Sequence, residues 1–414
     1  MRIARELRLS PADQSDLFYA LLMKDAGCSS NAARVYQLFG GDDQPVKAGL
    51  WTRDWRRWRD KLAYALEFAE RGGTPLQRVR QLATLAVAGP RSERELFAIR
   101  CDRGADIARE LGVSETTAVA IRTMDEHWDG GGYPEGLRRE QIPLHARIIG
   151  PAQVAEIYWG LGGPEAALDM AKARGGRWFD PELVKAFRTL GRHDALWTDL
   201  RSEALADRVA SAEPVERVIP AGEERLDRIA HAFALVVDAK SSFTYRHSDR
   251  VAAAAVAIGG QMGLPPVELT RLRRAGLLHD IGKLAVPNRI LDKPDRLDAD
   301  EWAIVRKHPY YTFEILARVP VFSEFAEDAS LHHERIDGKG YYRGVSGNAL
   351  SRHARILATA DIYDALSAAR PYREALPLER VLAIIAEGRG PQLCPETVDA
   401  LCAVQASAPD AIEA

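Results

Sequence analysis

Histidine and aspartate residues suited to metal binding are concentrated in one half of this 414-residue chain, and they restrict its fold more than any other feature. Half of the chain's 10 histidines lie in one ordered series with two aspartates. In chain order the series is His247, His279, Asp280, His308, His332, His333 and Asp361. Most of these residues are far apart in the sequence, so a shared site requires a fold that brings distant segments to one place.

The residue types indicate what such a site would bind. Imidazole nitrogens and carboxylate oxygens suit iron, manganese, nickel or zinc, whereas a structural zinc site is usually rich in thiolates. His279 and Asp280 are adjacent, and neighbours on a straight helix diverge by about 100°. At a helix end or around a cleft, one of these two residues could therefore bind a single ion while a carboxylate of the other bridges two. A lone histidine or HD dipeptide is more often structural, but the whole ordered series favours a metal centre.

Six segments of the second half resemble the HD-GYP phosphodiesterases of bacteria, a branch of the HD metal-phosphohydrolase superfamily. They are residues 246–252, 277–294, 307–316, 331–342, 355–366 and 370–376. The resemblance implies that the whole series named above ligates metal, with Asp280 as the bridge between two divalent ions. It favours iron or manganese, with nickel, zinc or magnesium as alternatives. Two ions about 3.5–4 Å apart are the usual arrangement for cleaving a phosphodiester.

The resemblance also assigns residues to the substrate. Lys283 matches the family lysine that contacts the substrate phosphate or assists the leaving group. Arg370 and Arg373 match basic positions that hold nucleotide phosphates, in keeping with the bidentate preference of guanidinium for phosphate. Tyr341 belongs to the signature loop, which commonly lines the substrate site. The implied activity is metal-dependent hydrolysis of a cyclic dinucleotide, most often cyclic di-GMP, to the linear dinucleotide.

Two alternative functions are compatible with these residues. The chain could be a nucleotide-sensing or protein-binding regulator with weak catalysis. It could also be an HD phosphohydrolase acting on another nucleotide. A substrate panel separates these alternatives from the phosphodiesterase.

The sequence departs from the family pattern at two positions. Phe243 stands where members with three metals carry a glutamate, and a phenyl ring cannot coordinate an ion. We therefore expect two ions rather than three. Tyr342 replaces the proline of the signature tripeptide, and losing the fixed φ of proline is expected to loosen that loop.

The first half of the chain repeats the second in a degenerate form. Residues 126–137 repeat the signature loop, and residues 145–158 and 17–28 parallel 353–366 and 272–283. The ligand positions of this first copy are occupied by Lys24, Asp25, Arg100, Met124, Asp125 and Gln153, and Cys28 stands in place of Lys283. We expect no metal there. Fixed positive charge from Lys24 and Arg100 could attract a nucleotide or phosphate, or a protein partner could dock there, but an inert scaffold is favoured.

The fold predicted for the whole chain is all-α, with two tandem HD-type helical domains. The expected boundaries are a degenerate domain at residues 1–200, a linker at 201–224 and a catalytic domain at 225–414. Ser10 followed by Pro11 predicts one helix start, and the capping-box pattern from Asp298 to Glu301 predicts another. The Arg- and Trp-rich segment 50–68 is predicted as one amphipathic helix that packs on its domain or on a partner chain.

Composition supports an ordinary globular enzyme. The chain is 46% hydrophobic and 28% charged, which is a balance typical of folded domains. The net charge of −3 provides no basic surface for general nucleic-acid binding. The four cysteines show no metal-site spacing, and no apolar run is long enough to span a membrane. We therefore expect a cytoplasmic enzyme without a signal peptide or membrane segment, with a homodimer possible.

Overall fold

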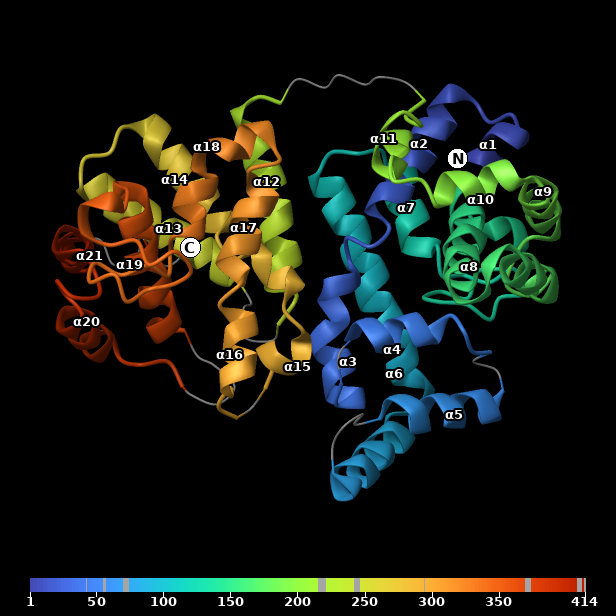
Figure 1. The fold of residues 1–414 in the computed structure, drawn as a ribbon, viewed down its shortest axis with the longest axis horizontal. Helices are drawn as coiled ribbons and strands as arrows, with labels where there is room; N and C mark the ends of the chain where they lie inside the picture. The colour runs from blue at the N-terminus through green and yellow to red at the C-terminus, as the bar shows by residue number, and fades with distance from the viewer. Residues whose placement is uncertain are drawn as a thin grey trace. The chain divides into compact units, whose positions relative to one another are not determined.

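The computed structural model describes residues 1–41, 43–54, 57–69, 74–214, 221–241, 246–293, 295–368, 374–407 and 412. Within these ranges the secondary structure is helical, and the only β-type pairings are isolated bridges between Gly175 and Phe179 and between Arg389 and Leu393. The all-α prediction is therefore confirmed. The chain divides into two compact units, Met1–Ala221 and Gly222–Ala414, which are coloured blue to green and yellow-green to red in Figure 1.

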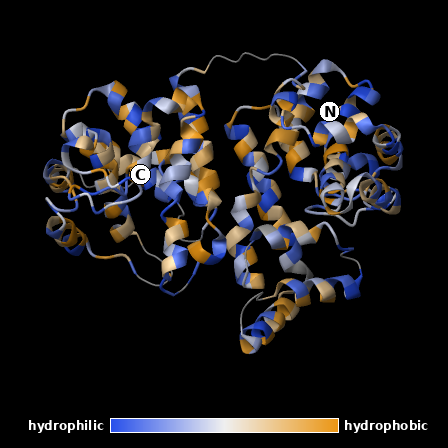
Figure 2. Ribbon diagram, viewed as in Figure 1, coloured by the Kyte–Doolittle hydropathy of each residue, from blue (hydrophilic) through white to orange (hydrophobic). Residues whose placement is uncertain are grey.

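The first unit has one main core and a smaller second cluster. Its helices are α1 (Arg2–Glu6), α2 (Pro11–Met23), η1 (Cys28–Asn31), α3 (Ala32–Phe39), α4 (Asp43–Leu50), α5 (Trp58–Phe68), α6 (Pro75–Glu110), α7 (Glu115–Thr123), η2 (Arg139–Gln141), α8 (Leu144–Arg174), α9 (Pro181–Gly191), α10 (Asp194–Leu200) and α11 (Leu205–Ala210). Ile121, Ile148 and Ile149 lie in the main core. The smaller cluster lies among α3, α4 and α5 and includes Leu38 and Tyr64. Hydrophobic and hydrophilic residues alternate along these helices, as amphipathic helices require (Figure 2).

The second unit is built around the alanine-rich helix α13. Its helices are α12 (Glu223–Asp238), α13 (His247–Gln261), α14 (Pro266–Leu278), η3 (Ile281–Ala285), α15 (Asn288–Leu291), α16 (Ala299–Val305), α17 (His308–Leu316), α18 (Pro320–Ser330), η4 (Gly347–Ala349), α19 (Arg352–Ser367), α20 (Leu378–Glu387) and α21 (Pro395–Ser407). Helix α13 packs on α14, α19 and α21. A Cβ on Gly276 of α14 would lie 2.8 Å from the Cα of Ala252 on α13. Small residues therefore allow these helices to approach closely, which places the start of α13 beside the end of α14.

The predicted helix starts are confirmed. The Ser10 side chain accepts a hydrogen bond from the Asp13 backbone N–H, with Pro11 at the first position of α2. Asp298 and Glu301 form a capping box at the start of α16. The predicted linker, residues 201–224, contains α11 and spans the division between the two units.

The prediction of one helix over residues 50–68 is wrong. Helix α4 ends at Leu50, Trp51 lies in a turn, and α5 begins only at Trp58. Tertiary contacts explain the break, because the Trp51 ring packs edge-on against Phe97 and the Asp54 carboxylate pairs with Arg177 at 2.7 Å. Trp55, which the same prediction placed on this helix, is outside the described residues. None of the helices in the described ranges has the length and apolar character needed to cross a bilayer.

Candidate metal centre

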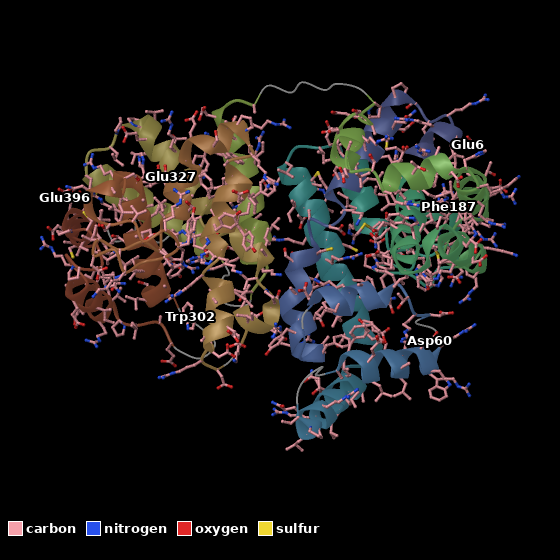
Figure 3. The ribbon with its side chains drawn as sticks, in the orientation of Figure 1. Glu6, Asp60, Phe187, Trp302, Glu327 and Glu396 are labelled. Atoms are coloured by element: carbon pink, nitrogen blue, oxygen red, sulfur yellow. The ribbon has the colours of Figure 1, made fainter. Side chains whose placement is uncertain are left out.

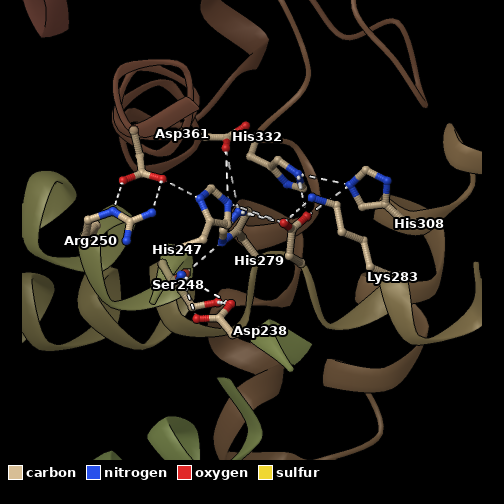
Figure 4. Close-up of polar contacts among 12 residues, drawn as sticks. Asp238, His247, Ser248, Arg250, His279, Lys283, His308, His332 and Asp361 are labelled. Atoms are coloured by element: carbon tan, nitrogen blue, oxygen red, sulfur yellow. Dashed lines mark hydrogen bonds and ion pairs between the residues drawn. The ribbon is translucent and has the colours of Figure 1, made fainter. Parts of the chain in front are cut away.

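The Asp280 carboxylate lies at the centre of the predicted ligand series. It lies between α14 and η3, immediately after His279, and its two oxygens face different histidines. Oδ2 lies 3.4 Å from both His247 Nε2 and His279 Nε2. Oδ1 lies 3.3 Å from His308 Nε2 and 3.7 Å from His332 Nε2. Asp280 therefore stands between two histidine pairs, as a carboxylate that bridges two ions would. Figure 4 shows these four histidines, His247, His279, His308 and His332, gathered in one place.

Asp361 and His333 complete the group. Asp361, on α19, lies 3.5 Å from His247 Nε2 and 3.9 Å from His279 Nε2 through its Oδ1. Its Oδ2 lies 3.7 Å from His333 Nδ1. The structure thus brings the whole predicted series together, from α13, α17, α19 and the segments that follow α14 and α18. Among the described residues, groups of three or more candidate ligands close enough to share an ion occur only in this unit.

The outer nitrogens of four histidine rings are held by acceptors. His279, His308 and His332 each donate from Nδ1 to a backbone carbonyl three residues earlier, at 2.7, 2.8 and 2.7 Å. His247 Nδ1 lies 2.6 Å from an Asp364 carboxylate oxygen. Because Nδ1 is the donor in each of these bonds, every Nε2 faces Asp280. This is the ring orientation that a metal-binding histidine requires.

Two buried polar atoms at the centre have no hydrogen-bond partner. They are His279 Nε2 and Asp280 Oδ1, and both residues are almost fully buried. A buried polar atom without a partner costs free energy, and metal coordination removes that cost. The set of imidazole and carboxylate donors also matches iron, manganese, nickel and zinc. The residues present therefore fit a pair of divalent ions.

Burial and charge separate the protonation states of the site. Burial lowers the pKa of His279 and that of His332, and it lowers the pKa of His333 to about 3, so these rings are neutral. Burial also lowers the pKa of His247, but its bonds to Asp280 and Asp364 outweigh this effect and raise the pKa to about 10. Burial opposes ionisation of Asp280 too, yet the charge of Lys283 and the hydrogen bond from His247 hold its pKa well below the usual range.

Sequence reasoning missed the residues that support His247. Asp364 is buried on α19 and contacts both His247 and Arg250. Asp238 is buried on α12 and accepts a hydrogen bond of 2.7 Å from the Ser248 hydroxyl, which anchors the first turn of α13. The sequence signal for these residues was their helical spacing. Asp364 lies one helical turn after Asp361, and Arg250 lies one helical turn after His247.

A cleft of about 670 Å³ opens onto this centre. Lys283 and Tyr341 line it, as do His247, His308, His333 and Asp361. Lys283 pairs with Asp280 Oδ2, and the Tyr341 ring lies 4.7 Å from the His333 ring. Trp302 on α16 also lines the cleft and is 45% exposed (Figure 3). Arg370 and Arg373, predicted to hold phosphates, and Phe243, at the third-metal position, lie outside the described residues.

The signature loop is held by a buried glutamate. Glu334 Oε1 accepts hydrogen bonds from the backbone N–H groups of Arg343 and Gly344, at 2.7 and 3.0 Å. The Tyr342 ring packs against the cluster of Leu331, Leu350 and Ala354. These contacts hold the loop around the tyrosine that replaces the usual proline.

The same loop contacts recur in the first unit. There Glu126 Oε1 accepts from the backbone N–H groups of Glu135 and Gly136, at the same 2.7 and 3.0 Å. A Cβ on Gly27 would lie 2.0 Å from the backbone oxygen of Arg100. The corresponding Cβ on Gly282 would lie 2.0 Å from the backbone oxygen of His308. These contacts place Arg100 at the position of His308.

In the first unit, ion pairs occupy the positions that correspond to candidate ligands in the second unit. Arg100 pairs with Asp125, and both side chains are buried. Lys24 pairs with the adjacent Asp25. Each cation is therefore neutralised by a carboxylate, which argues against the phosphate-binding role suggested for Lys24 and Arg100. Binding of a nucleotide or a protein partner by the first unit stays a prediction.

Comparisons with known proteins find a matching family and several similar proteins. The sequence profile of the HD domain family matches residues 57–183 and 232–395. A 3'3'-cGAMP-specific phosphodiesterase 3 of Vibrio cholerae is 42% identical over 405 residues, covering 97% of this chain and 87% of that protein. The cyclic di-GMP phosphodiesterase response regulator RpfG of Xanthomonas campestris is 35% identical over 210 residues, covering 49% of this chain and 54% of that protein. A crystal structure of a cyclic GMP-AMP-specific phosphodiesterase of V. cholerae covers 99% of this chain and 91% of its own, with a TM-score of 0.62 and 37% identity.

Proposed function

This chain belongs to the HD-GYP phosphodiesterases of the HD-domain family, and we propose that its second unit hydrolyses a cyclic dinucleotide to the linear dinucleotide. The observation that carries the proposal is the position of Asp280, whose two oxygens face separate histidine pairs. A carboxylate in that position can bridge two divalent ions, which is the arrangement suited to an in-line displacement at phosphorus.

The metal ligands we propose are His247, His279, Asp280, His308, His332, His333 and Asp361. Iron or manganese is our first choice, with nickel, zinc or magnesium as alternatives. When bound, two such ions supply a nucleophile from water at neutral pH and neutralise the charge that develops on the phosphate oxygens. The protein holds the donor atoms in place through the bonds at His247, His279, His308 and His332 described above.

Lys283 is the proposed acid or electrostatic partner of the leaving oxygen. Its ammonium group lies beside Asp280 and borders the cleft, with 22% of the side chain exposed. It can therefore reach both the bridging carboxylate and a bound phosphodiester. Arg370 and Arg373 are proposed, on the family resemblance alone, to position the phosphates through bidentate hydrogen bonds.

Aromatic groups around the cleft suit the bases of the substrate. Trp302 and Tyr341 both line the cleft, and the Arg306 guanidinium lies 5.4 Å from the centre of the Tyr341 ring. Stacking of a base on an aromatic ring contributes about 1–3 kcal/mol per base. We propose that at least one base stacks on the exposed Trp302.

For the substrate we propose 3'3'-cGAMP first and cyclic di-GMP second. The relative named for 3'3'-cGAMP matches nearly the whole chain, whereas the RpfG match covers about half of it. Cyclic di-GMP, expected from the family resemblance, therefore remains a competing substrate.

A substrate panel with purified full-length protein tests the proposal. The protein is loaded with Mn²⁺ or, without oxygen, with Fe²⁺, and the linear products of 3'3'-cGAMP and cyclic di-GMP are measured by chromatography. We expect hydrolysis that a chelator abolishes and that Asp280→Ala removes. Asp399→Ala, which alters an exposed ion pair, is the matched control. Full ion loading without cleavage of either substrate would refute the proposal and favour the regulator described above.

A further inference from the structure

The first unit contains a cavity at the position that corresponds to the substrate cleft. The cavity has a volume of about 500 Å³, and Arg100 and Tyr133 line it. The repeated contacts at Gly27 and Glu126 place these residues where His308 and Tyr341 line the cleft of the second unit. The first unit has therefore kept a cleft although its candidate metal ligands have been replaced.

The walls of this cavity are mainly apolar. The segment between Gly27 and Arg100 is longer than the one between Gly282 and His308, and the extra chain includes α4 and α5. Apolar side chains from α3 to α6 form the walls, among them Val35, Leu38, Val46, Leu62, Leu66 and Leu85. Leu62 and Leu66 remain 49% and 44% exposed. Apolar side chains that stay half-exposed around a concave site favour an apolar ligand.

The cations of the cavity do not provide net positive charge. Each lysine or arginine among its described lining residues pairs with a carboxylate. The pairs are Lys47 with Asp43 at 2.6 Å, Lys61 with Glu93 at 2.8 Å, and Arg100 with Asp125. A phosphate or carboxylate entering this site would lose its hydration without gaining an unpaired cation. The charge pattern therefore favours an uncharged ligand.

Two buried lining residues each have one polar atom without a partner. Asn31 is 5% exposed and Arg100 is 7% exposed. Asn31 Nδ2 donates to the backbone oxygen of Leu96 at 2.8 Å, but its Oδ1 has no hydrogen bond. Arg100 Nε likewise has none. Both atoms are covered by the surrounding protein and do not reach the cavity surface, so the described lining offers an entering ligand mainly apolar contacts.

We propose that this cavity binds an uncharged apolar molecule with an aliphatic or aromatic body. The body packs against the leucine and valine walls. The site is separate from the metal centre, so the proposal does not depend on the phosphodiesterase activity.

Displacement of a neutral fluorophore from the full-length protein tests this proposal. N-phenyl-1-naphthylamine is titrated first, because its fluorescence rises in apolar surroundings, and 1-decanol is then added as competitor. We expect 1-decanol to displace the fluorophore. Decyl methyl ether has the same apolar body without the hydroxyl group, so we expect it to displace the fluorophore as 1-decanol does. Decanoate, inorganic phosphate and 3'3'-cGAMP should not displace the fluorophore.

Two substitutions on α5 locate the binding site. Ala65 lines the cavity, whereas Ala63 is exposed on the same helix and does not line it. Ala65→Phe should therefore abolish fluorophore binding, and Ala63→Phe should retain it. If Ala65→Phe does not fold, Ala86→Trp at an exposed lining position takes its place.

Three results would overturn the proposal. The first is an absence of fluorophore binding by the unmodified protein. The second is equal binding by the Ala65 and Ala63 variants, which would place the fluorophore on another surface. The third is displacement by phosphate or 3'3'-cGAMP, which would assign an anionic ligand to the site.

Discussion

Replacing Asp364 by Asn should weaken metal binding without removing any proposed ligand. One oxygen of this buried carboxylate lies 2.6 Å from His247 Nδ1, and the same group pairs with Arg250. Asparagine has nearly the same shape but no charge, so it holds the His247 ring less firmly and makes Nε2 a poorer donor to the ion. Loss of such an outer partner typically lowers metal affinity about 10- to 100-fold, or about 1.4–2.7 kcal/mol.

A matched control separates this effect from the loss of a surface ion pair. Asp399 pairs with Arg389 on the surface, with side chains that are 60% and 46% exposed. Exposed pairs contribute little because solvent screens them. Asp399→Asn should therefore bind metal as the unmodified protein does, while Asp364→Asn should not.

Chelator competition with Mn²⁺ measures the affinity of each variant, and turnover is measured at limiting and at saturating Mn²⁺. Because Asp364 acts through His247, saturating metal should restore most of the turnover of Asp364→Asn. Two results would refute this reasoning. One is unchanged affinity in a folded variant. The other is full ion content with turnover that excess metal cannot restore, which would place Asp364 in the chemistry.

Four further outcomes are expected. Metal analysis of well-loaded protein should give about two ions per chain. In Asp280→Ala, metal analysis and kinetics should show that bound ions and turnover are lost together. The pKa of His247 in the metal-free site is about 10, so the ring is protonated at pH 7. Metal uptake should therefore release a proton, and metal affinity should rise with pH up to about 10. Calorimetry in buffers of different ionisation enthalpy measures the released proton. Lys283→Ala should mainly lower kcat, whereas Arg373→Ala should mainly raise KM, and equal kcat losses with unchanged KM would contradict these roles. Trp302→Ala should raise KM about tenfold if a base stacks there.

The convergence of the candidate ligands could be predicted from the sequence because their types and order are unusual together. Asp364 could not be predicted in the same way. An aspartate one turn after a candidate ligand is equally compatible with an exposed helix face, and only the packing of α13 on α19 brings it to His247. The local cap at Asp298 was predictable because a capping box depends on neighbouring residues alone.

The segment 50–68 shows where local patterning fails. Its tryptophans recur at helical spacing, which favours one helix in isolation. In the folded unit Trp51 instead packs on Phe97 and Asp54 pairs with Arg177. Partners far along the sequence decide the conformation here, and helical periodicity carries no information about them.

The two units meet the same structural demand with different chemistry. In each, a glycine lies against the backbone of a later helix, at Arg100 of α6 or His308 of α17, so that residue's side chain is placed beside the corresponding central space. In the second unit His308 faces Asp280, and the orphaned Asp280 oxygen there suits a cation. In the first unit the guanidinium of Arg100 already pairs with a buried carboxylate. Removing either partner of that pair would leave a buried charge uncompensated. A fixed arginine can thus replace a bound ion in holding the fold together, while it supplies neither an open coordination position nor an activated water. The repeat can therefore keep its architecture in both units even if only the second hydrolyses a phosphodiester.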